Sequence, residues 1–275
     1  MTFKLLPVAH ALALATLGST FAHAADPAIV MGEVRVSAQR DAGALRSSRV
    51  LTSVDVLGAD KIEDKNVTNS WELVGQLPGV QLTETRMGAE SGKASFRAFN
   101  GEGYINGIKV LIDGIPSNVN SGNQRFIDMI FPLEVDYIEV VRGTNDPRYG
   151  LHNIGGNLNI GTRQGGNYFD SRFTYGSFNT REVQAAYGRE ADGFAQNYFV
   201  ARQLTDSYRA NGDSNKYTVG GKWFVTSDDK AVTAGLVVRT YQHTSGEPGF
   251  LTAAELAADR RQSPRKNAND KTDRD

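Results

Sequence analysis

The 275-residue chain has no cysteine, and its charges nearly cancel: 30 Lys and Arg stand against 31 Asp and Glu, a formal net charge of −1. Without cysteine there is no disulfide framework, no thiolate zinc site and no cysteine nucleophile. A balanced charge gives no overall field that would favour nucleic acid or an anionic membrane surface as a partner. A hydrophobic fraction of 40% with 29 glycines is still enough for one or two packed domains.

Patterns typical of catalysis or metal binding are also missing. His152 and His243 lie far apart in the chain, with no acidic cluster at ligand spacing, so we expect no metal site. The segment Met87–Ser95 contains the Gly-Lys pair of a phosphate loop, but the spacing is one residue short and Ala94 replaces the magnesium-binding hydroxyl. No serine lies in a G-x-S-x-G sequence. We therefore predict no catalytic residues and no cofactor.

Long apolar runs are lacking except near the N-terminus. There, MTFKLLPVAHALALATLGSTFAHAAD has one early cation, an apolar stretch from Leu5 to Leu17 and an A-x-A site that ends at Ala24, as a signal peptide requires. This stretch is shorter than the roughly 20 apolar residues of a membrane anchor. We predict that residues 1–24 are a cleaved signal peptide. Any later segment that enters a membrane must then do so as strands.

Residues 25–44 are polar and contain one short alternating piece, GEVRVSAQR, at Gly32–Arg40. Val34 and Val36 fall on one face of this potential strand, and charged or polar residues fall on the other. The piece is either part of an N-terminal tail or a strand that adds to the sheet edge of another protein by main-chain hydrogen bonds.

The pattern of residues 45–166 predicts a small mixed sheet with short helices. A strand is expected at Val50–Gly58, followed by a short helix that Asn69 and Glu72 begin as a capping box and Pro78-Gly79 ends. Brief β-rich runs closed by glycine or proline follow, namely ASFRAFNGEG, KVLIDGIP, VDYIEVVRG and NLNIGTR. Asp113-Gly114 is interpreted as a turn between strands, in preference to a catalytic carboxylate.

From residue 167 onward the pattern changes to long alternating strands. Five are expected, near residues 168–176, 180–189, 194–204, 216–226 and 231–242. In the first, Phe169, Phe173 and Tyr175 share one face, and the polar Arg172 and Thr174 share the other. Such strands are typical of an outer-membrane barrel, although a soluble sandwich shows the same alternation with shorter strands. The connections near 190–193 and 227–230 are short and those near 205–215 and after 243 are long, which favours the barrel, although the connection at 177–179, on the same side as the long ones, is short as well.

In this order, the segments resemble the N-terminal part of a TonB-dependent outer-membrane receptor. The most specific piece is IEVVRGTNDPRYGLHNIGGNLNIGTR at residues 138–163, which is similar to the pattern I-E-V-[IV]-R-G, Y-G, G-G-x-[IL]-N-I of that family. The resemblance implies an α+β plug domain followed by antiparallel transmembrane β-barrel strands, with the barrel incomplete in this chain. It also implies uptake of a scarce nutrient, a ferric siderophore or ferric citrate, across the outer membrane of a Gram-negative bacterium.

Site residues follow from the resemblance. The TonB box, which pairs with TonB of the inner-membrane energising complex, would be Glu33, Val34, Arg35, Val36, Ser37 and Ala38. A plug latch of Arg97, Glu139 and Arg142 would hold the plug in place. Its two arginines would face acidic groups of the barrel wall, where a guanidinium favours a bidentate carboxylate. Turn or close-packing glycines would be Gly114, Gly143, Gly150, Gly155 and Gly156. The sequence departs from the family pattern at Ala98 and at Thr144-Asn145.

The resemblance leaves the ligand open. Thr85–Lys93 and Pro116–Arg125 are candidate ligand loops, because apical plug loops contact ligand in the family. Alternatives are a non-transporting binding protein or adhesin, and a receptor for haem, cobalamin or a saccharide. The expected partners are TonB, outer-membrane lipid and a ferric siderophore, and no nucleic acid. The residues after Gly166 suffice for about five of the roughly 22 strands of a plugged barrel, so we expect a fragment of a longer receptor.

Overall fold

The computed structural model describes residues 53–86, 92–96, 99, 107–119, 124–143 and 153–274. Residues 41–275 form one compact unit, to which every contact reported below belongs. The predicted signal peptide and TonB box, together with Arg97 and Gly150, lie outside the described residues.

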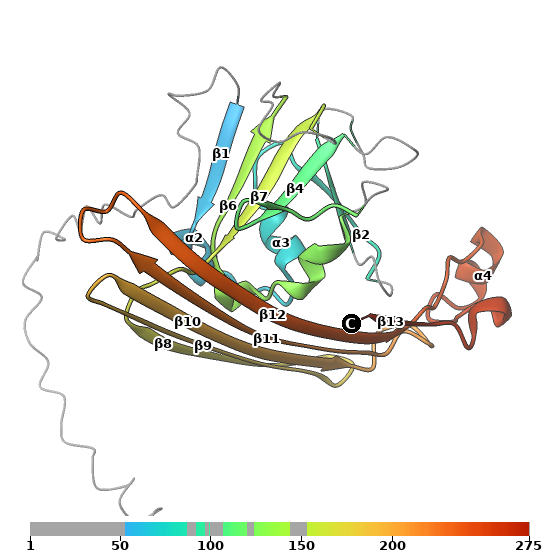
Figure 1. Ribbon diagram of the computed structural model, residues 1–275. Helices are drawn as coiled ribbons and strands as arrows, with labels where there is room; N and C mark the ends of the chain where they lie inside the picture. The colour runs from blue at the N-terminus through green and yellow to red at the C-terminus, as the bar shows by residue number, and fades with distance from the viewer. Residues whose placement is uncertain are drawn as a thin grey trace, which may run out of the picture. The chain divides into compact units, whose positions relative to one another are not determined.

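A five-stranded mixed sheet forms the first part of the fold, with the strand order β1-β6-β7-β4-β5 (Figure 1). Its strands are β1 (Ser53–Gly58), β4 (Ile108–Ile112), β5 (Ile115–Pro116), β6 (Val135–Arg142) and β7 (Gly156–Thr162). The β4–β7 pair is parallel and the other three pairs are antiparallel. A separate hairpin joins β2 (Gln81–Glu84) to β3 (Gly92–Ser95). This agrees with the predicted small mixed sheet.

One face of the mixed sheet forms the main hydrophobic core. Ile138 and Val140 of β6 and Leu158 of β7 are fully buried there, because side chains alternate between the two faces of a strand. The helix α3 (Ser70–Val74) adds Trp71 and Leu73 to the same cluster. Burying each such side chain contributes about 1.5–3 kcal/mol, so this core holds α3 against the sheet.

The start of α3 shows half of the predicted capping box. Asn69 Oδ1 accepts a hydrogen bond from the Glu72 backbone N–H at 3.1 Å, as an N-cap does. The Glu72 carboxylate, however, accepts from the side chains of Thr68 and Asn69 at 3.0 Å each. The helix ends at Val74 rather than at Pro78-Gly79, and turns fill the interval. The other short helices are α2 (Ala59–Glu63), η2 (Arg125–Met129) and η3 (Pro132–Glu134).

The second part of the fold is a six-stranded antiparallel sheet with the order β13-β12-β11-β10-β9-β8. The strands are β8 (Tyr168–Gly176), β9 (Thr180–Ala191), β10 (Phe194–Thr205), β11 (Ser214–Thr226), β12 (Thr233–Gly246) and β13 (Lys271–Arg274). The five predicted alternating strands are thereby confirmed. Between β12 and β13 lie α4 (Ala253–Ala258) and η5 (Arg265–Asn267), which the alternation did not predict. Among the described residues, no helix is long and apolar enough to cross a membrane.

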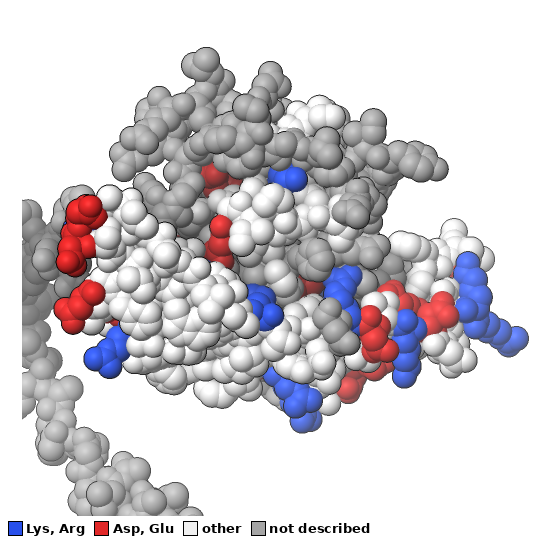
Figure 2. All heavy atoms as spheres, viewed as in Figure 1, with Lys and Arg blue, Asp and Glu red and all other residues white. Residues whose placement is uncertain are grey.

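The faces of the antiparallel sheet are reversed relative to those of a soluble protein. Polar residues such as Gln184 and Thr218 are fully buried on the inner face, whereas Phe173 and Tyr175 on the outer face are 76% and 80% exposed. An aromatic row crosses the outer face, where the Tyr198 ring lies 6.2 Å from Tyr187 and 5.7 Å from Trp223. In the view of Figure 2, most charged side chains lie toward the strand ends. This arrangement suits lipid outside and a polar interior.

Candidate functional site

The candidate site is the interface between the mixed-sheet domain and the inner face of the antiparallel sheet. Two buried ion pairs cross it, Asp113 with Lys222 and Glu134 with Arg239. In both pairs the acid belongs to the mixed-sheet domain and the cation to the antiparallel sheet. The two residues of each pair are more than 100 positions apart in sequence.

Asp113 lies at the tip of the β4–β5 hairpin. Asp113 and Gly114 have φ values of 52° and 78°, and two such residues form the tight turn that Asp-Gly favours. The turn directs the Asp113 carboxylate onto the end of β7, where it accepts from the Thr162 backbone N–H at 2.7 Å. The same carboxylate accepts from Lys222 Nζ at 2.6 Å. Both charged side chains are less than a tenth exposed, so Lys222 fixes the turn and the end of β7 to β11.

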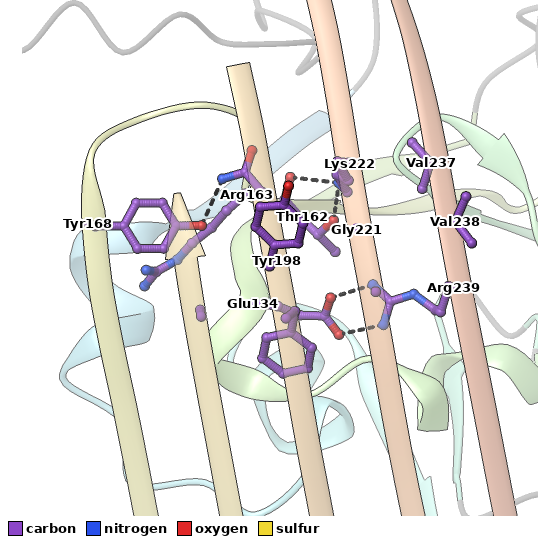
Figure 3. Close-up of a pocket in the computed structure, with 14 residues that line it drawn as sticks. Glu134, Thr162, Arg163, Tyr168, Tyr198, Gly221, Lys222, Val237, Val238 and Arg239 are labelled. Carbon is purple, nitrogen blue, oxygen red and sulfur yellow. Dashed lines mark hydrogen bonds and ion pairs between the residues drawn. The ribbon is translucent and has the colours of Figure 1, made fainter. Parts of the chain in front are cut away.

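The Glu134–Arg239 pair is two-pronged. Glu134 Oε1 accepts from Arg239 Nη1 at 2.9 Å, and Oε2 pairs with Nη2 (Figure 3). Glu134 Oε1 also accepts from the Phe131 backbone N–H at 3.1 Å, which orients the carboxylate at the end of η3. A planar guanidinium matches a carboxylate in this way better than an ammonium does. Arg239 thus holds the η3 turn against β12.

A small cavity of about 20 Å³ lies beside Lys222 and the Glu134–Arg239 pair. Glu134, Thr162, Arg163, Lys222 and Arg239 are among its lining residues (Figure 3). That volume holds about one water molecule, and the lining offers the polar partners that a buried water needs. The cavity is too small for a nutrient.

The segment that joins the two sheets is itself fixed to the inner face. Asn197 of β10 accepts from the Gly165 N–H at 2.6 Å and donates to the Gly165 carbonyl at 2.9 Å. Asn197 also donates to the Tyr168 hydroxyl at 2.9 Å. The Arg163 guanidinium lies 4.8 Å from the centre of the Tyr168 ring and pairs with Asp170. The chain therefore enters β8 along one defined path.

Single hydrogen bonds complete the interface. Gln184 accepts from the Leu133 N–H at 2.9 Å, Arg172 donates to the Lys65 carbonyl at 3.1 Å, and Gln203 donates to the Thr68 carbonyl at 2.9 Å. The main apolar contact is Phe131 against Phe199, with ring centres 6.2 Å apart. Each neutral hydrogen bond contributes only about 0.5–1.5 kcal/mol because water can replace it. The interface is thus specific, yet water can take over most of its contacts.

Two groups at the start of β6 have raised pKa values. Burial raises the pKa of Asp136 above its usual range, and the nearby Arg163 and Lys222 oppose that shift. Burial, assisted by the charge of Glu139, raises the pKa of Tyr137 to about 12. Asp136 therefore adds a destabilising charge beside the cations of the interface.

Arg142, a member of the predicted latch, makes its described contacts inside the mixed-sheet domain. Its guanidinium donates to Ser53 Oγ at 2.9 Å, pairs with Asp55 and donates to the Pro78 carbonyl. It therefore ties the edge strand β1 and the turn after α3 to the end of β6. Glu139 is fully buried on β6, opposite Asn159 of β7. The predicted contact of Arg142 with acidic groups of a barrel wall, and the role of Glu139 in holding the plug, stay predictions.

The predicted turn glycines and ligand loops are described in part. Gly156 has φ of 127°, and a Cβ there would lie 2.0 Å from the Val141 carbonyl oxygen, so β6 and β7 approach too closely for a side chain. In the loop Pro116–Arg125, the Asn118 side chain binds Val110 N–H at 2.7 Å and the Ile108 carbonyl at 3.1 Å. Of the loop Thr85–Lys93, residues 87–91 lie outside the described residues. The described residues contain no group of three or more potential metal-ligating His, Cys, Asp or Glu side chains.

The sequence did not predict that Asp113, Glu134, Lys222 and Arg239 form ion pairs across the interface. One signal was present for Lys222, which the alternation of β11 assigns to the polar face. Asp113 was recognised only as a turn residue, and its carboxylate gains a partner through the fold.

Comparison with known proteins identifies the first domain. Residues 46–157 match the family model described as the TonB-dependent receptor plug domain. This part of the chain is a plug domain of that kind, and the chain as a whole is similar to a fragment of a TonB-dependent receptor. From here on, the described residues from 53 to 162 are called the plug, and the six-stranded sheet β8–β13 is called the wall.

Curated relatives support this assignment. The vitamin B12 transporter BtuB of Vibrio vulnificus is 27% identical over 183 residues, which cover 62% of this chain and 28% of that protein. The ferric enterobactin receptor PirA of Pseudomonas aeruginosa is 27% identical over 212 residues, which cover 71% of this chain and 26% of PirA. The chain thus spans about a quarter of the length of these relatives.

Solved structures share the fold. The ferric citrate transporter FecA in its unliganded form has a TM-score of 0.65 at 24% identity, covering 78% of this chain and 34% of FecA. The ferric yersiniabactin uptake receptor FyuA from Yersinia pestis has a TM-score of 0.64 at 18% identity, covering 77% of this chain and 34% of FyuA. The plug and the adjoining wall strands are therefore arranged as in those receptors.

Proposed function

We propose that the chain forms the plug and first wall strands of an outer-membrane receptor that imports a ferric siderophore or ferric citrate, driven through TonB. The observation that carries the proposal is a plug held by buried ion pairs on the polar face of a wall with an apolar outer face. Relatives named as transporters or receptors for ferric complexes and vitamin B12 favour uptake over adhesion.

The contacts of the interface suit a plug that stays bound to the wall at rest and moves relative to it during uptake. The Asp113–Lys222 and Glu134–Arg239 pairs keep the plug in register with the wall at rest. Hydrogen bonds to wall side chains such as Gln184 and Gln203 can be exchanged for water when TonB pulls on the predicted box at Glu33–Ala38. An apolar interface of the same size would resist that exchange more strongly.

The orientation of the wall follows from its connections. The β9–β10 turn at residues 192–193 and the β11–β12 turn at residues 227–232 are short. At the other end of the wall, residues 206–213 and 247–270 form long connections, and the β8–β9 turn at residues 177–179 is the one short connection among the described residues there. Wall strands of this kind have short periplasmic turns and long external loops. The long connections would then face the medium, and the predicted signal peptide at residues 1–24 would direct export.

Uptake by whole cells tests the proposal. A Gram-negative host that lacks its own ferric-citrate, siderophore and cobalamin receptors is given the protein that contains this chain. We expect radiolabelled iron to accumulate from ferric citrate or a ferric siderophore, and the accumulation to vanish in a matched host without TonB. Labelled cobalamin entering in place of iron would reassign the substrate. Ligand bound at the surface without TonB-dependent accumulation would support the non-transporting alternative.

A further inference from the structure

A second polar cluster lies on the inner face of the wall, near its externally oriented end. Lys216 of β11 and His243 of β12 are register partners, and Tyr241 precedes His243 by two residues on the same face. Asp128 of η2 approaches from the plug. All four side chains are more than nine-tenths buried. The cluster differs from the two ion pairs, whose cations Lys222 and Arg239 lie farther along β11 and β12 toward the short β11–β12 turn.

Two atoms of the cluster have no hydrogen-bond partner among the described residues, Tyr241 Oη and His243 Nδ1. The other ring nitrogen, His243 Nε2, lies 2.9 Å from Ser214 Oγ, so the imidazole is fixed with Nδ1 turned away from that contact. Buried polar groups are nearly always satisfied by protein, water or ligand. The two rings lie on one strand with their centres 6.2 Å apart, so the two atoms mark a place where a water molecule or a ligand can bind.

The charges around these atoms identify the kind of occupant. Lys216 and Arg274 are cations that act on the His243 ring, and Asp128 is the opposing acid. Asp128 Oδ1 accepts from Trp71 Nε1 at 3.3 Å, and the Lys216 ammonium lies 5.1 Å from the centre of the Phe131 ring. The Tyr241 hydroxyl and the Lys216 ammonium are hydrogen-bond donors, and the His243 ring donates from Nδ1 when Ser214 Oγ donates to Nε2. This group of donors with a net positive charge favours an acceptor that is itself negative.

We propose that Lys216, Tyr241 and His243 form a subsite for a carboxylate or similar oxyanion group of the imported ligand. The inference rests on the proposed function and narrows the substrate to anionic ferric complexes, such as those of polycarboxylates. The location fits, because β11 and β12 meet the long connections at this end. The η2 helix on the plug side continues directly from the predicted ligand loop Pro116–Arg125.

The substitution Tyr241→Phe distinguishes whether the Tyr241 hydroxyl binds ligand or only stabilises the fold. The substitution removes only the hydroxyl, which has no partner among the described residues. If nothing but the protein surrounds that hydroxyl, its loss leaves ligand affinity unchanged and the fold as stable or more stable, because a desolvated group disappears. If a ligand oxyanion accepts its hydrogen bond, the same change weakens binding.

The experiment measures equilibrium binding of ferric citrate, and of a neutral ferric trihydroxamate, to outer-membrane vesicles that contain the complete receptor. We expect Tyr241→Phe to raise the Kd of ferric citrate about 5-fold, the value of one hydrogen bond, and Lys216→Met to raise it about 10-fold or more. The neutral complex should bind more weakly to the wild type and respond little to either change. Tyr217→Phe is the matched control, because Tyr217 lies on the same wall but on the opposite face of β11 from Lys216.

The outcomes separate this inference from the proposed function. Wild-type binding of both complexes with an unchanged Kd in Tyr241→Phe would overturn the subsite and leave receptor function intact, with bound water as the occupant. If the wild type binds neither complex, calorimetry with iron-free citrate decides the subsite independently. Citrate binding lost in Tyr241→Phe would support the subsite although the proposed function failed, and no citrate binding would overturn both.

Discussion

Asp113 and Lys222 show how single residues define the interface. The family pattern predicts plug arginines that meet wall acids, whereas the pairs described here combine plug acids with wall cations. Arg142 contacts Asp55 within the plug, and its contact with wall acids stays a prediction. A buried ion pair adds little net stability, but removal of one partner leaves an uncompensated buried charge. Removing either partner alone should therefore strongly destabilise the fold.

Lys222→Met should lower the free energy of unfolding by about 3–5 kcal/mol, because the Asp113 carboxylate loses its ammonium partner. The double variant with Asp113→Asn should recover part of that loss, since no buried charge remains. Urea unfolding of the purified protein in detergent measures both. Lys230→Met is the control, because Lys230 is exposed in the β11–β12 turn, and it should change stability by less than about 0.5 kcal/mol. Equal effects at Lys222 and Lys230 would contradict the buried pair.

Asp136→Asn should change how stability depends on pH. Burial raises the pKa of Asp136 in the folded state, so ionisation costs more there than in the unfolded chain. The wild type therefore loses stability as pH rises from the unfolded pKa, near 4, through the raised folded value. The advantage of the variant should be absent at lower pH and grow as pH increases. A difference in urea midpoint that stays constant with pH would contradict this assignment.

At the scale of elements, the pairing of β6 with β7 depends on one close backbone approach. Gly156→Ala should cost about 2–6 kcal/mol, because backbone strain and a clash with the Val141 carbonyl act together. Gly114→Ala is the matched change, with φ of 78° but nothing within 4 Å of the added Cβ. Gly114→Ala should lower the free energy of unfolding by only about 1–2 kcal/mol, because alanine is strained in the left-handed conformation. Similar unfolding midpoints for the two variants would contradict the close approach.

Most elements could be predicted because local pattern determines them. Period-two alternation over about ten residues located β8 to β12, and glycine or proline marked the ends of β4 and β6. The capping of α3 was only half right, because the Glu72 carboxylate bonds to the Thr68 and Asn69 side chains instead. β13 was missed, since its four residues, Lys-Thr-Asp-Arg, are all polar and carry no apolar period.

At the scale of the whole molecule, the contacts that matter join distant segments. The positions of Asp113 and Lys222 differ by 109 residues, so no spacing in the sequence reveals their pairing. The same limit applies to Tyr241 and Asp128, whose proximity depends on the docking of η2 against β12. Sequence patterns predicted the two sheets and the resemblance to TonB-dependent receptors. The fold was needed to find which charges face one another.

We propose that a pull on the predicted TonB box drives import of the ligand. Val36→Pro removes a main-chain donor from the strand that would pair with TonB, whereas Val36→Ala keeps that donor. The measurement compares binding and energised uptake of the labelled ferric complex by cells that carry each variant. We expect unchanged binding in both, uptake near the wild-type level in Val36→Ala, and uptake reduced to the level of cells without TonB in Val36→Pro. Wild-type uptake in Val36→Pro would contradict the account.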